Sequence, residues 1–128
     1  MEMRFQIPRC ILTTLNQLHD MERKLAKDGD SVNVSRNVGK IKAAFAEEGL
    51  PTFDPSESVR LVYEDPMGQP FSETRTDLEA SISGVATDDL VVVEVIKPII
   101  RAVIRDGAGE FSRVVQKGIV VVESRKER

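Results

Sequence analysis

The feature that most constrains this chain is a change of hydrophobic period at Gly49-Leu50-Pro51. Before it, apolar residues recur every three or four positions, as on one face of a helix. After it, Gly, Pro, Asp and Ser become frequent, and apolar β-branched residues alternate or cluster, as they do in strands. The sequence therefore predicts an α+β fold, in which an N-terminal helical hairpin (residues 1–50) is followed by a small all-β domain (residues 51–128).

Two helices are expected before that change. The first runs from Pro8 to about Lys27, and Glu22 places a charge in its apolar seam, which should weaken the contact there. Asp28-Gly29-Asp30-Ser31 predicts a stop and a turn. The second helix runs from about Ser35 to Glu48, with Asn33 or Ser35 as its cap and Gly49 as its end.

A hairpin of two helices cannot cover both of its apolar seams by itself. It must pack on the rest of the chain or on a second copy, which would give a four-helix bundle in a homodimer. Packing within one monomer and packing between two copies both remain open at this point. The seam residues expected at a dimer interface are Ile11, Leu15, Leu18, Leu25, Val38, Ile41 and Phe45.

Strands are expected along most of the remaining chain. Pro98 is expected at an edge, a bend or a bulge, because it cannot donate to a central ladder. Asp106–Gly109 predicts a hairpin turn, and Ser124–Arg128 a solvated tail. Leu78–Ile82 fits a strand or a short helix. The clearer strands are Val59–Tyr63, Leu90–Ile96, Ile99–Arg105, Phe111–Val115 and Ile119–Glu123.

The residue inventory argues against an enzyme. The chain has one histidine (His19), one cysteine (Cys10) and one tyrosine (Tyr63), so Cys–His pairs and multi-histidine metal sites have almost nothing to draw on. No catalytic residue, metal site or cofactor is predicted. His19 is expected on the surface, and Cys10 is expected to be a buried or half-buried apolar residue.

The charge and the hydropathy of the chain limit the kinds of partner that it can be expected to bind. With 18 Lys and Arg against 21 Asp and Glu, the net charge is -3, which disfavours nucleic acid as a partner. No apolar run is long enough to span a bilayer, and residues 1–9 show no signal-peptide core. A single cysteine fits a reducing compartment, so the expected location is the cytoplasm, with no membrane partner. Lys97, Arg101, Arg105 and Arg113 lie around the last strands, where they are either ordinary surface charges or anchors of a protein interface.

Several short segments of the chain resemble GrpE, the nucleotide exchange factor of DnaK-type chaperones. Gly68-Gln69-Pro70-Phe71 resembles the Gly-x-Pro-Phe turn of that family, and Leu78-Glu79-Ala80 its His-Glu-Ala. The helix from Ile11 to Leu25 is similar to the first bundle helix. Two longer segments resemble the first and closing strands of the family's β domain, namely Val92–Pro98 and Arg113–Val122.

The resemblance implies a co-chaperone that acts in the stress response without catalysis. It would bind the ATPase domain of a DnaK-type chaperone, as a homodimer, and promote ADP release by favouring the open cleft. The family's partner-contacting residues would fall on Ile96, Arg113 and Gln116. Together with the cationic residues near the last strands, the expected partner-binding set is Ile96, Lys97, Arg101, Arg113 and Gln116.

The chain also departs from the family pattern. Leu78 replaces the histidine, Ser72-Glu73 replaces Asp-Pro, and the long N-terminal helix of the family is expected to be missing. Phe53-Asp54-Pro55 offers a second register for the resemblance. Two other classes of function stay open: a structural or assembly protein that oligomerises through its helices, and a small-molecule-binding regulatory domain.

Overall fold

The computed structural model describes residues 7, 9–28, 32–50 and 56–127. Two helices come first and strands follow, so the predicted α+β layout is confirmed. The helices are α1 (Arg9–Asp28) and α2 (Val32–Glu47). The strands are β1 (Ser58–Glu64), β2 (Pro70–Phe71), β3 (Leu78–Ser83), β4 (Leu90–Lys97), β5 (Ile99–Asp106), β6 (Gly109–Gln116) and β7 (Gly118–Ser124), and a short 3₁₀ helix, η1 (Arg125–Glu127), follows.

The chain forms two compact units whose limits differ from the expected border at residue 50. Unit 1 comprises Met1–Tyr63 and Arg101–Arg113. Unit 2 comprises Glu64–Ile100 and Val114–Arg128. The strand β1 and most of the β5–β6 hairpin therefore belong with the helices, because these segments make their contacts there.

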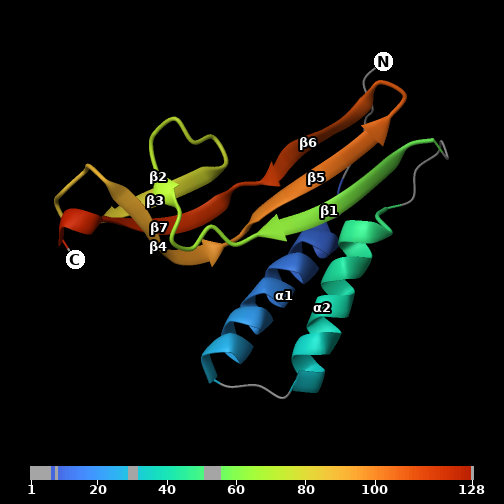
Figure 1. Cartoon of the computed structure of the whole chain (residues 1–128), viewed down its shortest axis with the longest axis horizontal. Helices are drawn as coiled ribbons and strands as arrows, with labels where there is room; N and C mark the ends of the chain where they lie inside the picture. Colours follow the sequence, from blue (N-terminus) through green and yellow to red (C-terminus); the bar gives the residue numbers. More distant parts are fainter. Residues whose placement is uncertain (1–6, 8, 29–31, 51–55, 128) are drawn as a thin grey trace. The chain divides into compact units, whose positions relative to one another are not determined.

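Unit 1 combines a helical hairpin with a sheet of order β1-β5-β6 (Figure 1). Leu15 and Leu18 of α1 and Val38 of α2 are buried, as the periodicity of the two seams predicts. In the tight turn between β5 and β6, the backbone N–H of Ala108 donates to the side chain of Asp106 at 2.8 Å. This confirms the hairpin turn expected at Asp106–Gly109.

The end of α2 depends on Gly49. The residue has φ of +76°, the left-handed conformation in which glycine avoids the penalty of a Cβ atom. Its N–H donates to the carbonyl of Ala44 at 3.3 Å, and a Cβ built at this position would lie 2.5 Å from the carbonyl oxygen of Val59. The next residue, Leu50, donates to the same oxygen at 2.7 Å, so the close approach ties the helix end to β1.

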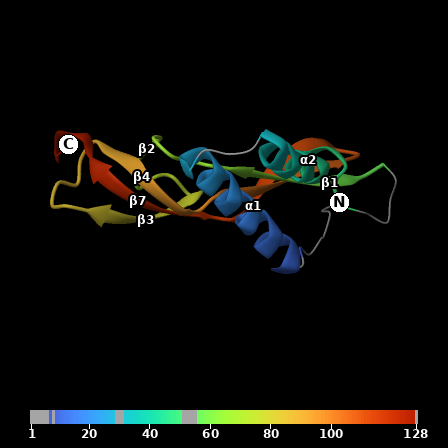
Figure 2. The same ribbon diagram turned by 90° about the horizontal axis from the view of Figure 1, so that it is seen from below.

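Unit 2 is built on a sheet of order β2-β4-β7-β3, which Figure 2 shows in that sequence. The strand β7 pairs antiparallel with β4 and parallel with β3. Gly118 is the first residue of β7. A Cβ built at this position would lie 2.8 Å from the side chain of Leu78, so the absence of a side chain lets Leu78 pack directly against the strand. The buried residues of this core are Leu78, Leu90, Val92, Val95, Ile99, Val120 and Val122.

Two β-bulges interrupt β4. Its pairing with β7 shifts between Val92 and Glu94 and again between Val95 and Lys97. Strict alternation from Val92 would turn Glu94 into the core, and strict alternation from Val95 would do the same to Lys97. Each bulge inserts one extra residue, so both charged side chains stay exposed while Val92 and Val95 are both buried.

Several local expectations were wrong. The helix α2 already begins at Val32, so Asn33 and Ser35 lie inside it and neither is its cap. Cys10 is exposed, because it lies in the first turn of α1, away from the buried seam. Ser124 is fully buried at the end of β7, so the solvated tail begins only after it.

Other expectations lie outside the described residues. They are the helix start at Pro8, the turn over residues 29–31 and the second register at Phe53-Asp54-Pro55. Leu78–Ile82 forms a strand, which settles the choice left open between a strand and a short helix.

Candidate protein-docking site

Ile96 is the exposed apolar side chain that the second bulge of β4 produces. It is the extra residue between Val95 and Lys97, and it is 56% exposed. Bulges re-aim side chains and are frequent next to functional sites. Val92 and Val95 of the same strand are buried in the core, so they hold in place the backbone that carries Ile96.

Two other predicted contact residues, Lys97 and Gln116, lie near the end of β4 within unit 2. Lys97 follows Ile96 directly and is exposed, with Ile119 of β7 as its partner in the ladder. The side-chain amide of Gln116 donates to the carbonyl of Pro98 at 3.1 Å, which binds the end of β6 to the end of β4. Lys97 therefore follows Ile96 on the strand, and Gln116 is held at Pro98, directly after the end of β4. We name Ile96, Lys97 and Gln116 the β4-end patch.

The other two predicted contact residues belong to unit 1. Arg101 is half-buried on β5, and Arg113 is exposed on β6. The same sheet holds an ion-pair network across its three strands, in which Glu110 accepts from Arg105 at 3.0 Å and from Arg60 at 3.3 Å. Arg105 is thus engaged in cross-strand pairing.

The residues expected at a dimer interface differ in how exposed they are in the single chain. Leu15, Leu18 and Val38 are buried within the single chain, where they join the helices to their own unit. Ile41 is 46% exposed. Ile11, Leu25 and Phe45 are half-buried.

A polar cluster, which we name the Tyr63 latch, connects the helical hairpin to β1. The hydroxyl of Tyr63 donates to Glu22 of α1, and the ammonium of Lys42 of α2 lies 3.7 Å from the same carboxylate oxygen. That ammonium also lies 4.5 Å from the centre of the Tyr63 ring, a cation–π geometry. Burial, then the hydrogen bond and negative charge of Glu22, raise the pKa of Tyr63 above its ordinary value of 10.0.

His19 completes the latch and corrects the expectation of a surface histidine. It is only 3% exposed, and its ring meets that of Tyr63 edge-on, with centroids 5.9 Å apart and an interplanar angle of 83°. Sequence reasoning missed this cluster because it considered His19 by its place on one helix, whereas β1 supplies the covering ring. Glu22, which is expected to weaken the apolar seam of the first helix, accepts a hydrogen bond from the Tyr63 hydroxyl.

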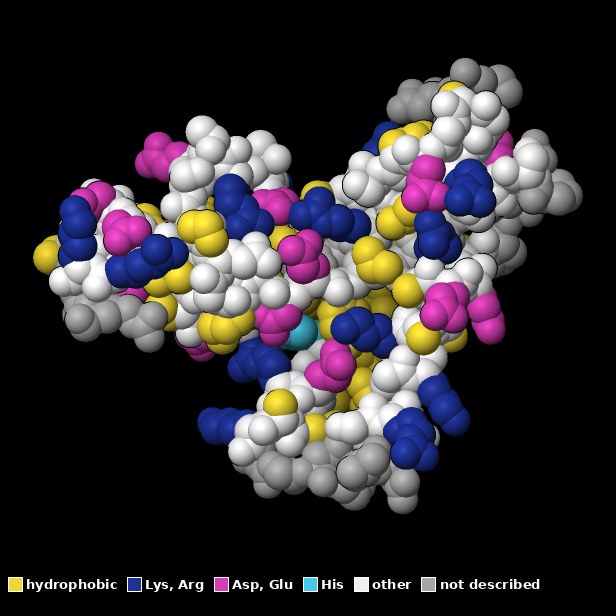
Figure 3. All heavy atoms as spheres, viewed as in Figure 1, with side chains coloured by type: hydrophobic (Ala, Val, Ile, Leu, Met, Phe, Trp, Pro, Cys, Tyr) yellow, Lys and Arg dark blue, Asp and Glu magenta, His cyan; other side chains and the backbone are white. Residues whose placement is uncertain are grey.

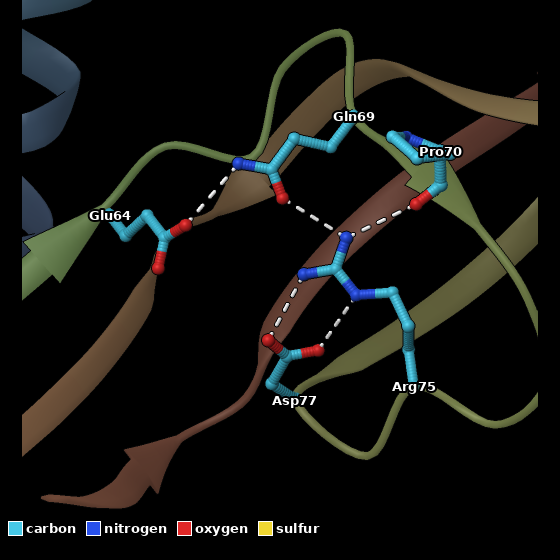
Figure 4. Close-up of polar contacts among 5 residues, drawn as sticks. All are labelled: Glu64, Gln69, Pro70, Arg75 and Asp77. Atoms are coloured by element: carbon cyan, nitrogen blue, oxygen red, sulfur yellow. Dashed lines mark hydrogen bonds and ion pairs between the residues drawn. The ribbon is translucent and has the colours of Figure 1, made fainter.

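A second polar network fixes the segment between β1 and β3 in unit 2 (Figure 4). The guanidinium of Arg75 binds the carboxylate of Asp77 through two bonds of 3.0 Å. It also donates to the side chain of Gln69 at 3.0 Å and to the carbonyl of Pro70 at 3.1 Å. The amide of Gln69 donates in turn to Glu64 at 3.2 Å, so every member acts as a structural brace.

The surface charge is mixed where it can be followed. On the face seen in Figure 3, basic and acidic side chains of the described residues are interspersed, without a broad basic area of the kind that binds phosphates. Among the described residues, no group of three or more His, Cys, Asp or Glu is placed to hold a metal ion. No described helix is both long and apolar enough to cross a membrane.

No protein-family model, curated protein or solved structure matches this chain.

Proposed function

We propose that this chain is a GrpE-like co-chaperone that binds the ATPase domain of a DnaK-type chaperone and promotes ADP release. The observation that carries the proposal is the exposed Ile96 at a bulge of a well-packed strand, next to Lys97. An exposed isoleucine on a rigid support is suited to docking, because it gains burial on contact and loses little conformational freedom.

Exchange activity of this kind needs no catalytic group. The factor must bind the open-cleft form of the ATPase domain more tightly than the closed form, since equal affinity would shift nothing. Opening the cleft removes contacts from ADP, and the coupling is reciprocal, so bound nucleotide weakens the affinity of the factor. In this proposal the β4-end patch makes the differential contact.

Binding to the nucleotide-free ATPase domain tests the proposal. In calorimetric titrations, Ile96→Lys should bind more than tenfold more weakly than the wild type, because a charged ammonium would take the place of an apolar side chain that the complex buries. Ile82→Lys on β3 is the matched control and should bind normally, since Ile82 is 46% exposed on a different strand of the same sheet. Absence of binding by the wild type, or equal binding by Ile96→Lys, would refute the assignment.

A second candidate is an assembly protein that oligomerises through its helices. The observation that favours it is the exposure of apolar side chains on the hairpin: Met21 is 43%, Val34 41% and Ile41 46% exposed. In this case the chain would associate with itself in the absence of any chaperone. The double variant Met21→Lys, Ile41→Lys should then no longer assemble. Neither the wild type nor this variant should bind the chaperone.

A further inference from the structure

The strand β3 forms a regular open edge of the unit 2 sheet. In the described part of the chain it is the terminal strand, and its neighbour in the sheet is β7. Its register with β7 runs from Leu78↔Gly118 to Ser83↔Glu123 without a shift. An edge of this kind presents a row of backbone N–H and C=O groups on its outer side.

The outward-pointing residues of β3 follow from the ladder. The N–H of Gly118 donates to the carbonyl of Asp77 at 3.0 Å, which sets the phase of the pairing. Alternate residues of a strand bond to the same neighbour, so Glu79 and Ser81 direct their backbone groups toward β7. Ala80 and Ile82 consequently direct theirs toward the open side.

The two edges of this sheet differ in how well they are protected. On the far side, β2 has only two residues and starts at Pro70, and the exposed length of β4 carries both bulges. Short strands, proline and bulges all discourage pairing with another chain. The strand β3 has none of these devices and no lysine, and its Ile82 is 46% exposed.

We propose that β3 pairs antiparallel with β3 of a second copy, about a two-fold axis through Ser81. In this register Ser81 faces Ser81, Glu79 faces Ser83, and no like charges lie opposite each other. Ile82 faces the small, half-buried Ala80 of the other copy, so each copy covers the exposed isoleucine of its partner. The outward groups of Ala80 and Ile82 exchange both of their hydrogen bonds.

A two-fold axis through Ser81 covers the exposed Ile82 better than an axis through Ala80 does. Centring on Ala80 would place Ile82 against Leu78, whose side chain is already buried in the core of its own unit. The self-pairing closes on itself, as an isologous contact does. Because one short strand contributes little area, we expect a dissociation constant of about 10 μM or weaker.

Sedimentation velocity of the full chain over a concentration series tests the self-association. Ile82→Lys should weaken one association step at least tenfold, and Ile96→Lys, the same substitution on another strand, should leave that step unchanged. Equal behaviour of the wild type and Ile82→Lys would overturn the proposal.

Disulfide trapping tests the register in a Cys10→Ser background, which removes the native thiol. Ser81→Cys should crosslink two copies under mild oxidation, because residues facing each other in a non-hydrogen-bonded pair have Cα atoms about 4.5 Å apart. Ser83→Cys lies on the same face but about 13 Å from its equivalent, beyond disulfide reach, and is the control. Equal crosslinking of both variants, or none by Ser81→Cys at concentrations where the chain associates, would contradict the pairing. Neither assay uses the chaperone, so failure of the proposed function leaves this inference intact.

Discussion

Removing the hydroxyl of Tyr63 tests the Tyr63 latch with the smallest possible change. Tyr63→Phe deletes the donor to Glu22 but keeps the aromatic ring, which lies edge-on to His19 and 4.5 Å beneath the ammonium of Lys42. The ring packing and the cation–π contact should therefore persist. The substitution isolates one hydrogen bond.

The magnitude follows from the exposure of the acceptor. A hydrogen bond to a charged group contributes about 1.5–3 kcal/mol when its loss leaves that group unsatisfied. The side chain of Glu22 is 39% exposed and keeps the Lys42 ammonium at 3.7 Å, so water and the ion pair compensate in part. We therefore expect Tyr63→Phe to lower the free energy of unfolding by about 1 kcal/mol.

Urea unfolding followed by far-ultraviolet circular dichroism measures this loss. A double-mutant cycle with Glu22→Ala should give a coupling energy of about 0.5–1 kcal/mol, since both changes remove the same bond. Additive effects of the two substitutions, or a Tyr63→Phe variant as stable as the wild type, would refute the latch.

The same contact makes a pH prediction that the single tyrosine allows to be measured directly. The folded pKa of Tyr63 lies above the ordinary value of 10.0, so its contribution to stability is complete below pH 10.0 and is lost as the pH rises from there toward the folded pKa. Tyrosinate absorbance should thus appear near pH 10.0 in the urea-unfolded chain, and only at higher pH in the native chain. Coincident titration of the two states would show that the hydroxyl is neither buried nor bonded to Glu22.

Three further substitutions test local features of the fold. Gly49→Ala should cost about 2 kcal/mol of unfolding free energy, because it combines a left-handed backbone with a Cβ contact of 2.5 Å; an unchanged urea midpoint would contradict this. Arg75→Lys should cost about 1–2 kcal/mol, since an ammonium cannot reproduce the two-bond geometry to its carboxylate partner, and a loss below about 0.3 kcal/mol would mean that the brace is dispensable. The Lys126 ammonium lowers the pKa of Asp88, so the pair stabilises the fold above pH 3.8 and this stability is lost as the pH falls through the lower folded pKa. Stability differences between the wild type and Asp88→Asn should accordingly shrink in acid, and a constant difference would exclude the pair.

Much of the secondary structure could be predicted from the sequence because its signals are local. The apolar period of α1 and the Gly49 stop mark the helices, and the β-branched run from Leu90 marks β4. The grouping of elements into units could not be predicted in the same way. It depends on which strand pairs with which, and nothing in the spacing of β1 shows that it shares a sheet with β5 and β6.

The sequence offers candidate contact residues but not their geometry. The resemblance to GrpE predicts Ile96 as a contact residue, whereas the structure explains its exposure by a bulge. A usable signal was present: Glu94 and Lys97 stand three positions apart inside a strand, a spacing that a regular ladder cannot keep on one face. The Tyr63 latch left no such signal, because His19 and Tyr63 lie far apart in the sequence.

The release rate of fluorescent ADP from a DnaK-type chaperone, measured by stopped flow with and without this protein, tests the proposed function most directly. We expect the wild-type chain at micromolar concentration to accelerate release at least tenfold, Ile96→Lys to abolish most of the acceleration, and Ile82→Lys to retain it. An ADP release rate that does not change as the wild-type protein is added would contradict the account.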